Sequence, residues 1–353
     1  MELGISTFGE IRPDGVAGNA KNAHRRMKEL IEEARLADEV GLDVYALGEH
    51  HRPDFVISAP EVIMAAIATV TKKIKLSSAV TVLSSADPVR VFQNFASVDL
   101  ISDGRVEIMA GRGSFIESFP LFGYDLNDYN ELFTEKLDLL LKINQSEIVS
   151  STGHLRPSIK KQGVYPRPLQ EKLPIWLAVG GTPESAARAG KMNIPMTLAI
   201  LGGPPDRFVS FTDLYRKSAK EAGHDVASIP LAINTHFFLA EDSQNASDTL
   251  YPTYETLMNR IGRERGWSPL NRAQFEYSRT KNGPLVVGSV QEVTDKILYL
   301  HELFQNTRYL AHLTAGDIPH DKVMKAIELF GTRVAPEVRK EVAKRKNLQK
   351  ANE

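Results

Sequence analysis

The chain has 353 residues, of which 42% are hydrophobic and 25% are charged, and its formal net charge at pH 7 is −1. This is the composition of a globular protein with a large core, and it offers no basic surface to a nucleic-acid backbone. The absence of cysteine excludes disulfides, a thiolate nucleophile and cysteine-ligated metals. Because we find neither a signal-peptide pattern nor an apolar run of membrane-spanning length, we expect a cytoplasmic protein without membrane contact.

Short apolar runs alternate with segments of helical period from the start of the chain. Residues 3–8 are predicted to be a strand, and Met27, Leu30, Ile31 and Ala34 then fall on one face of a helix. Gly41 follows, where a helix C-terminus favours a residue that tolerates positive φ. Further strands are predicted at 43–51, 74–83, 105–111, 175–181, 194–200, 231–240 and 308–314. Further helices are predicted at about 61–71, 89–101 and 131–143.

Eight strands in alternation with helices are typical of a (β/α)8 TIM barrel, and their nearly continuous hydrophobicity suits a parallel sheet covered by helices. We expect residues 1–353 to form one such domain. The long connections after strands four and seven, 111–174 and 240–307, are predicted to be insertions near one mouth of the barrel. The Lys- and Arg-rich stretch 333–350 is predicted to be a solvated terminal helix.

The second predicted strand ends in Glu49, His50 and His51. Chemistry in such a barrel belongs at the C-terminal strand ends, and alternation requires only one of the two histidines to face the mouth. An imidazole there can act as an acid or a base. A metal site is an alternative, but the other candidate ligands, His236 and His312, lie inside predicted strands.

Two glycine-rich turns follow the fourth and fifth predicted strands. The first places Arg112 between two glycines, where its guanidinium can hold a phosphate. The second, Gly180-Gly181-Thr182-Pro183-Glu184-Ser185, precedes a helical run whose N-terminus favours an anion. Each turn alone could be a plain loop with a helix cap. Their occurrence on adjacent strands favours a phosphorylated ligand.

Together these motifs resemble the bacterial luciferase-like monooxygenase superfamily of flavin-dependent oxidoreductases. The resemblance covers most of the chain, and the stretch from the third to the fourth predicted strand carries it most clearly. The matching segments are LGISTF, GLDVYALGEHH, SSAVTVLSSADPVRVFQNFASVDLISDGRVEIMAGRGS, YPRPLQEKLPIWLAVGGTPESAARAG, LVVGSVQEVTDKI and GDIPHDKVMKAIELFGTRVAPEVR.

The resemblance implies a cofactor site with named residues. Family members bind FMN, or the deazaflavin F420 in one branch, at the C-terminal mouth of the barrel. Arg112 matches the arginine that contacts the flavin phosphate, and the turn of strand five, with Gly180, Gly181, Thr182 and Ser185, matches the family's phosphate-binding turn. Ala79 and Val80 match a pair behind the flavin ring that is joined by a cis peptide bond in several relatives, and we expect such a bond here.

The resemblance also implies an activity. His50 matches the histidine required in luciferase, with Glu49 before it, so we assign both to the catalytic site. Ala110 stands where luciferase has a reactive cysteine, and we expect a non-luminescent monooxygenase. A separate reductase would supply reduced FMN, which reacts with O2 to form a C4a-hydroperoxide that oxygenates a small organic substrate. Phe115 and Phe119 are candidates for its apolar pocket, and a homodimer is expected.

Three alternatives remain at this point. An F420-dependent oxidoreductase could use the same barrel, although that branch tends to have Asp-His-Phe where this chain has Glu49-His50-His51. A non-catalytic flavin-binding protein would keep the fold without turnover. A metal-dependent barrel hydrolase or isomerase would use His50 and His51 as ligands.

Overall fold

A computed structural model describes residues 1–11, 20–113, 115–313 and 318–352 of the chain. Its centre is a closed barrel of parallel strands in which each strand pairs with the next, and the last pairs with the first. The barrel strands are β1 (Glu2–Thr7), β2 (Val44–Leu47), β3 (Lys75–Ser78), β5 (Val106–Gly111), β8 (Ile175–Val179), β9 (Met196–Ile200), β10 (Leu231–Leu239) and β12 (Arg308–Leu313). The predicted (β/α)8 barrel is therefore confirmed.

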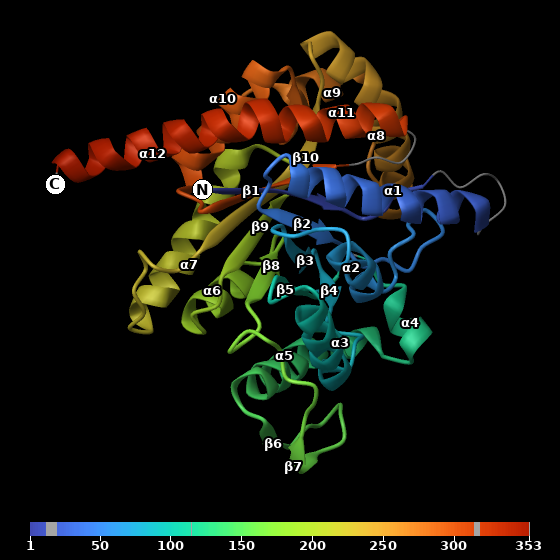
Figure 1. The fold of residues 1–353 in the computed structure, drawn as a ribbon, viewed down its shortest axis with the longest axis vertical. Coiled ribbons are helices and arrows are strands. Elements are labelled where there is room, and N and C mark those ends of the chain that lie inside the picture. Colours follow the sequence, from blue (N-terminus) through green and yellow to red (C-terminus); the bar gives the residue numbers. More distant parts are fainter. Residues whose placement is uncertain (12–19, 114, 314–317, 353) are drawn as a thin grey trace.

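Helices cover the outside of this barrel (Figure 1). They are α1 (Ala20–Glu39), α2 (Pro60–Ala68), α3 (Pro88–Ile101), α5 (Tyr129–Gln145), α6 (Pro183–Lys191), α7 (Val209–Glu221), α10 (Val290–Phe304) and α11 (His320–Leu329). In α1, Leu30 and Ala34 are fully buried, as the helical period predicts. Gly41 ends this segment with φ +76°, which confirms its predicted role.

Three predicted strands end earlier than the apolar pattern suggests. The third divides into β3 and β4 (Thr81–Val82), with the expected cis peptide bond between Ala79 and Val80 at the break. The second and fifth stop at Leu47 and Val179, before glycines that weaken strand pairing. The residues that follow, including His50 and Gly180, therefore lie in loops at the barrel mouth.

The predicted insertions contain elements that the apolar pattern did not reveal. The first holds α4 (Ser118–Phe122), the 3-10 helix η1 (Leu126–Asp128) and, after α5, the hairpin of β6 (Ile148–Ser151) and β7 (Ile159–Gly163). The second holds α8 (Ser243–Arg265), α9 (Arg272–Arg279) and β11 (Val286–Gly288), which pairs with β10. The hairpin lies beside α5 and α3 on the outside of the barrel, and Arg156, from the loop between its strands, donates to Asp87, the N-cap of α3, at 2.7 Å (Figure 1).

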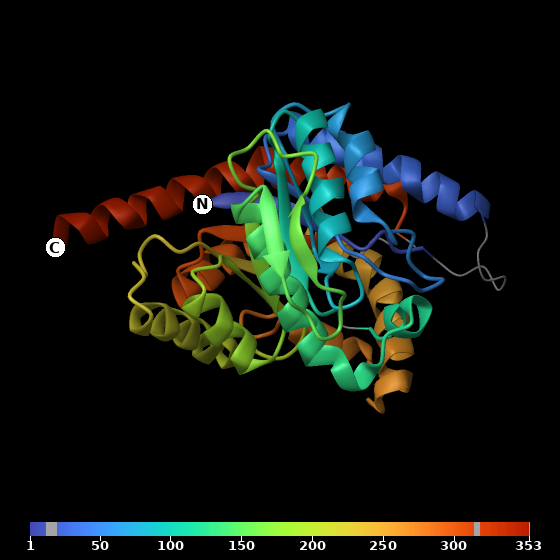
Figure 2. The same ribbon diagram turned by 90° about the horizontal axis from the view of Figure 1, so that it is seen from below.

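The last helix, α12 (Ala335–Asn352), confirms the predicted terminal helix. It follows the π-helical turn η3 (Phe330–Val334) and extends past the barrel, so that the C-terminus lies away from the body of the protein (Figures 1 and 2). Within the described parts of the chain, no helix has the length and apolar character needed to cross a membrane.

The two ends of the barrel interior differ in chemistry. At the N-terminal end, Arg308 reaches across from β12 to Glu107 on β5, with bonds of 2.7 and 3.0 Å, and also binds Glu2 at 2.7 Å. Its guanidinium lies 4.2 Å from the ring centre of Trp176, and this cluster closes the N-terminal end of the barrel. The C-terminal end is open and leads into a cavity.

Candidate functional site

A cavity of about 600 Å³ occupies the C-terminal mouth of the barrel. Eight of the nine site residues expected from the sequence line it: Glu49, His50, Ala79, Val80, Arg112, Gly180, Gly181 and Thr182. The ninth, Ser185, is buried one step behind the wall and bonds to Arg112. The fold thus brings all the predicted residues to one place.

One end of the cavity is built around the guanidinium of Arg112. Its Nη1 donates to Asn130 at 2.7 Å, and its Nη2 donates to Thr182 at 2.7 Å and to Ser185 at 3.2 Å. Burial and the nearby charge of Arg112 lower the pKa of Arg188 on α6. Two guanidinium groups therefore raise the positive potential at this end, which favours an anion.

The turn between β8 and α6 strengthens this preference. Thr182 occupies the N-cap position of α6, but its side chain makes no capping bond and binds Arg112 instead, so the backbone N–H of Glu184 donates no hydrogen bond to the cap residue. A Cβ added at Gly180 or Gly181 would meet nothing within 4 Å, so a ligand can approach the backbone closely. A helix N-terminus, an arginine and open glycines form a donor set that fits an organic phosphate.

A narrow apolar wall adjoins this anion site. Val80 lies so close to Gly111 that an added Cβ would come within 2.8 Å of its side chain, and only glycine fits there. Ala79, Val80 and Ala178 pack against the buried Met109 inside the barrel. These small side chains leave room for a flat ring against the wall next to the phosphate end.

His50 faces the cavity from the loop after β2 and is only 8% exposed. Its ring stacks on Phe55 with centroids 4.4 Å apart and meets Phe8 and Phe115 edge-on at 4.4 and 5.1 Å. Burial among these rings lowers the pKa of His50 to about 3. The imidazole is therefore neutral at physiological pH.

Glu49 and His51, the neighbours of His50 in the sequence, contact each other through their side chains. Glu49 accepts from the backbone N–H of Val82 at 2.8 Å, and its other oxygen lies 2.8 Å from His51 Nε2. His51 turns to Phe122 on α4, with ring centroids 5.3 Å apart, and does not line the cavity. This confirms that only one of the two histidines faces the mouth, and it shows Glu49 tying the β2 loop to β4.

The two phenylalanines expected in the pocket have different places. Phe115 lines the cavity beside His50. Phe119, a residue of α4, is fully buried and stacks on Tyr129 with ring centroids 5.5 Å apart. It does not line the cavity, so the prediction for it was wrong. Its position on the inner side of α4 makes it a packing residue.

Sequence reasoning missed Thr197 and Asn234 on the opposite wall, and it considered His236 and His312 only as metal ligands. Thr197 on β9, Asn234 and His236 on β10, and His312 on β12 all line the cavity. His236 and Tyr254 meet edge-on at 5.3 Å, and burial lowers the pKa of His236 to about 3. The signal was available, because Asn234 and His236 alternate with outward-facing residues of the same strand.

The insertion helices close the cavity from above through an ionic cluster. Arg52 donates to Glu117 at 2.6 Å and to Glu264 on α8 at 2.5 and 3.0 Å. Asp54 accepts hydrogen bonds from Arg52 and from Arg260, also on α8. The guanidinium of Arg52 lies 4.6 Å from the ring centre of Phe115. These contacts link the loops after β2 and β5 to α8.

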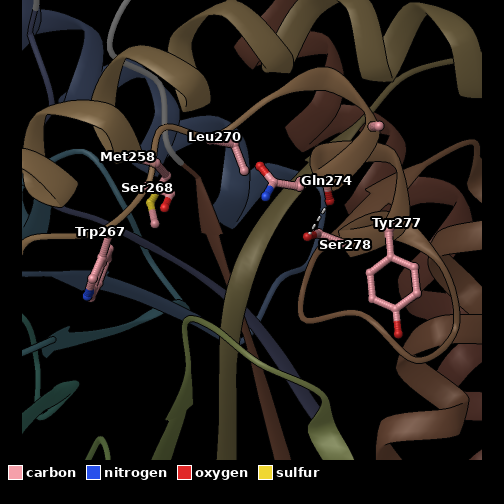
Figure 3. Close-up of a pocket in the computed structure, with 8 residues that line it drawn as sticks. Met258, Trp267, Ser268, Leu270, Gln274, Tyr277 and Ser278 are labelled. Atoms are coloured by element: carbon pink, nitrogen blue, oxygen red, sulfur yellow. Dashed lines mark hydrogen bonds between the residues drawn. The ribbon is translucent and has the colours of Figure 1, made fainter.

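A second hollow of about 570 Å³ lies between α8 and α9, outside the barrel (Figure 3). Met258 and Trp267 border both this hollow and the main cavity. Figure 3 shows Leu270 and Gln274 between Trp267 on one side and Tyr277 on the other. The end of α8 is therefore a thin partition between the two spaces.

Among the described residues, no group of three or more His, Asp or Glu side chains could hold a metal ion.

Comparison of the sequence with protein families gives one match over most of the chain. The model of the family described as luciferase-like monooxygenase matches residues 1–307. The chain is similar to the uncharacterized protein y4vJ of Sinorhizobium fredii, with 23% identity covering 90% of this chain and 93% of that protein. It is also 29% identical to the alkanal monooxygenase alpha chain of Photorhabdus laumondii, over 63% of this chain and 62% of that protein.

Solved structures share the fold at lower identity. The monooxygenase RslO1 of Streptomyces bottropensis superposes with a TM-score of 0.83, at 22% identity over 96% of this chain and 99% of that one. The oxygenating constituent of 3,6-diketocamphane monooxygenase from Pseudomonas putida, in complex with FMN, has a TM-score of 0.75 at 22% identity, over 95% and 98%. The F420-dependent tetrahydromethanopterin reductase of Methanopyrus kandleri reaches 0.73 at 18%, over 96% and 99%.

Proposed function

The chain belongs to the luciferase-like monooxygenase family, and we propose on this basis that it uses reduced FMN and O2 to oxygenate a small organic substrate. The observation that carries the proposal is the anion site at Arg112 beside a narrow apolar wall, which together suit a flat ring with a phosphate tail. The structure of a diketocamphane monooxygenase with FMN, which shares the fold, supports the choice of cofactor.

Each group has a role in this proposal. Arg112, Thr182, Ser185 and the first turn of α6 hold the phosphate, and Ala79 and Val80 support the ring. When bound, reduced FMN supplies the oxygen chemistry, through the C4a-hydroperoxide expected for the family. His50 takes part as a neutral imidazole at the ring edge, and Glu49 positions its loop. Phe8, Phe55 and Phe115 exclude water.

The second candidate is an F420-dependent oxidoreductase on the same barrel. Two F420-dependent enzymes share the fold with TM-scores of 0.73, and one is an F420-dependent secondary alcohol dehydrogenase. Both cofactors carry a phosphate that Arg112 could hold, so the anion site does not separate them. The sequence Glu49-His50-His51 after β2 favours FMN, by resemblance to the luciferase branch.

We also propose a homodimer supplied by a separate flavin reductase. Exposed apolar side chains on two neighbouring outer helices support the dimer: Val62 on α2 is 67% exposed, and Leu100 and Ile101 on α3 are 47% and 50% exposed. Large apolar side chains gathered on a surface favour association. Light scattering of the purified chain measures the assembly.

Anaerobic titration with reduced FMN and with reduced F420 tests the proposed cofactor. We expect FMN to bind more tightly than F420, and Arg112→Met to weaken FMN binding about 10- to 100-fold, because charge-assisted bonds to the phosphate are lost. Riboflavin, which lacks the phosphate, should bind equally to both proteins. Arg35→Met, on an exposed part of α1, is the control. Unchanged FMN affinity in Arg112→Met would contradict the assignment.

Rapid mixing of the reduced complex with oxygen then tests the activity. A flavin absorbance transient distinct from the reduced and oxidised forms supports a monooxygenase. Direct reoxidation without such a transient supports a flavin carrier, and tight binding of F420 alone supports the deazaflavin enzyme. Failure of every flavin to bind overturns the proposed function.

A further inference from the structure

Asn234 carries a hydrogen-bond acceptor whose direction is fixed by its neighbours. Its Nδ2 donates to Ser6 Oγ at 2.8 Å and to the carbonyl oxygen of Leu310 at 3.0 Å. A carbonyl oxygen can only accept, so the amide cannot be turned around without placing two oxygens against each other. The Asn234 side-chain oxygen is therefore directed away from these neighbours, and among the described residues it has no hydrogen-bond partner.

A chain of buried groups holds this amide in place. Because Ser6 accepts from Asn234, its hydroxyl is free to donate to His312 Nδ1, 3.2 Å away. The other nitrogen, His312 Nε2, lies 3.3 Å from a carboxylate oxygen of Glu10, whose second oxygen accepts from Thr7 at 3.2 Å. A side chain with buried anchors of this kind loses little entropy when a ligand binds, so it suits recognition.

A second polar group lies on the neighbouring strand. Thr197 on β9 is 2% exposed and lines the cavity, and its hydroxyl has no hydrogen-bond partner in the described parts of the chain. It pairs with Ala232, two residues before Asn234 on β10, so both side chains face the interior as diagonal neighbours. A buried hydroxyl without a partner costs stability, and a bound ligand can satisfy it.

The place of this pair in the barrel separates it from the proposed flavin site. The strand order puts β10 across the barrel from β3, after which Ala79 and Val80 support the flavin ring. A ligand that contacts Asn234 and Thr197 therefore meets the side of the ring away from that wall. Besides His236 and His312, the lining there includes the apolar side chains of Phe8, Leu201, Phe208, Leu257 and Leu310.

We propose that Asn234 and Thr197 recognise a hydroxyl group on an otherwise apolar, uncharged substrate. The substrate hydroxyl donates to the Asn234 side-chain oxygen and accepts from the Thr197 hydroxyl. A hydrocarbon of the same shape would leave both groups unsatisfied in a dry cavity, and an ether, which can accept but not donate, would leave the Asn234 oxygen unsatisfied. This inference rests on the proposed function for the position of the flavin, but it concerns only groups of the opposite wall.

Calorimetric titration of the full chain with 2-naphthol and with its methyl ether tests the inference, first without flavin and then with FMN. In the unaltered protein we expect the naphthol to bind about tenfold more tightly, because one matched hydrogen bond is worth about 1.4 kcal/mol. In Asn234→Leu the naphthol and its methyl ether should bind with about the same affinity. Thr197→Val keeps the shape of the side chain and should weaken the binding of both probes about equally, because the oxygen of either probe can accept from the Thr197 hydroxyl; this result can be measured even if Asn234→Leu does not fold.

Thr81→Val is the matched control, because the Thr81 hydroxyl is also buried without a partner among the described residues but does not line the cavity. It should leave the affinity for both probes unchanged. Equal binding of both probes, binding of neither, a preference that survives Asn234→Leu, or unchanged affinity for both probes in Thr197→Val overturns the inference. The inference is also overturned if Asn234→Leu weakens FMN binding as much as it weakens naphthol binding, because Asn234 would then contact the flavin. Failure of FMN to bind the unaltered chain is a separate result that concerns the proposed function.

Discussion

The imidazoles of His50 and His236 both lie in the cavity wall, and burial lowers the pKa of each to about 3. A charge on either ring would have to form in an apolar environment, where few groups compensate for lost hydration. Both rings are neutral in the folded protein at neutral pH. Each neutral ring can donate one hydrogen bond and accept another from a ligand, but neither carries the second proton of an imidazolium at neutral pH.

These two histidines should make the protein sensitive to acid. Below the unfolded-state pKa of about 6.5 the unfolded chain takes up protons that the folded chain refuses, so stability falls as the pH decreases toward 3. Above that pKa the effect vanishes. The loss is on the order of 1 kcal/mol per histidine for each pH unit. His50→Gln should move the acid-unfolding midpoint, followed by circular dichroism, to lower pH.

His24→Gln, at an exposed position of α1, provides the control and should leave the acid midpoint unchanged. An identical midpoint in His50→Gln and the unaltered protein would show that His50 accepts a proton in the folded state. The imidazole would then be available as an acid, contrary to its burial.

At the scale of elements, the last turns of α8 are held to the loop after β2 by ionic contacts. Arg52 and Asp54, from the loop after β2, bind Glu264 and Arg260 on its last turns. The same turns lead to Trp267, which separates the cavity from the outer hollow (Figure 3). Helix propensity alone cannot place α8, because its burial is limited to a few side chains.

Loss of the Arg52 contacts should therefore loosen the end of α8. We expect Arg52→Gln to increase amide hydrogen exchange in residues 257–267 about tenfold, which corresponds to about 1.4 kcal/mol of local stability. The barrel strands should exchange as before. Arg263→Gln, on an exposed part of the same helix, should have no effect. Protection that remains intact in Arg52→Gln would mean that apolar packing alone holds the helix.

At the scale of the whole molecule, an ionic cluster at the N-terminal end of the barrel connects strands that lie across from each other. Arg308 is 1% exposed and neutralises Glu107, on β5 across the barrel, and Glu2, on the neighbouring strand β1. Burial raises the pKa of Glu2, but the charges and hydrogen bonds of Arg308 and Lys75 outweigh this effect and hold the pKa below its usual value. Removal of this cation leaves the buried Glu107 without its two hydrogen bonds from Arg308, whereas Glu2 keeps its contact with Lys75.

Arg308→Met should lower the free energy of unfolding by about 3–5 kcal/mol, because an uncompensated charge then stays inside the barrel. Urea titration measures the change. Lys75→Met is the comparison, since Lys75 is 42% exposed and also binds Glu2, and it should cost less than about 1 kcal/mol. Similar losses for the two variants would show that Glu107 and Glu2 reach water when Arg308 is absent.

The sequence by itself determined the barrel and located the two turns that carry the proposed phosphate site. Strand and helix patterns are local, so Leu30, Ala34 and Gly41 could be placed without tertiary information. Arg112 and Gly180 belong to short turns whose chemistry is complete within a few residues. The resemblance to a family added the ring wall at Ala79 and Val80.

Only the tertiary structure decided which groups meet across the barrel. Ser6 and His312 are 306 residues apart in sequence, and Arg52 and Glu264 are 212 apart, yet each pair is in contact. No local pattern encodes such contacts, because the register between strands and the closure of the barrel set them. Burial follows from the same closure, and for that reason the neutral state of His50 and the free acceptor of Asn234 emerge only in the folded chain.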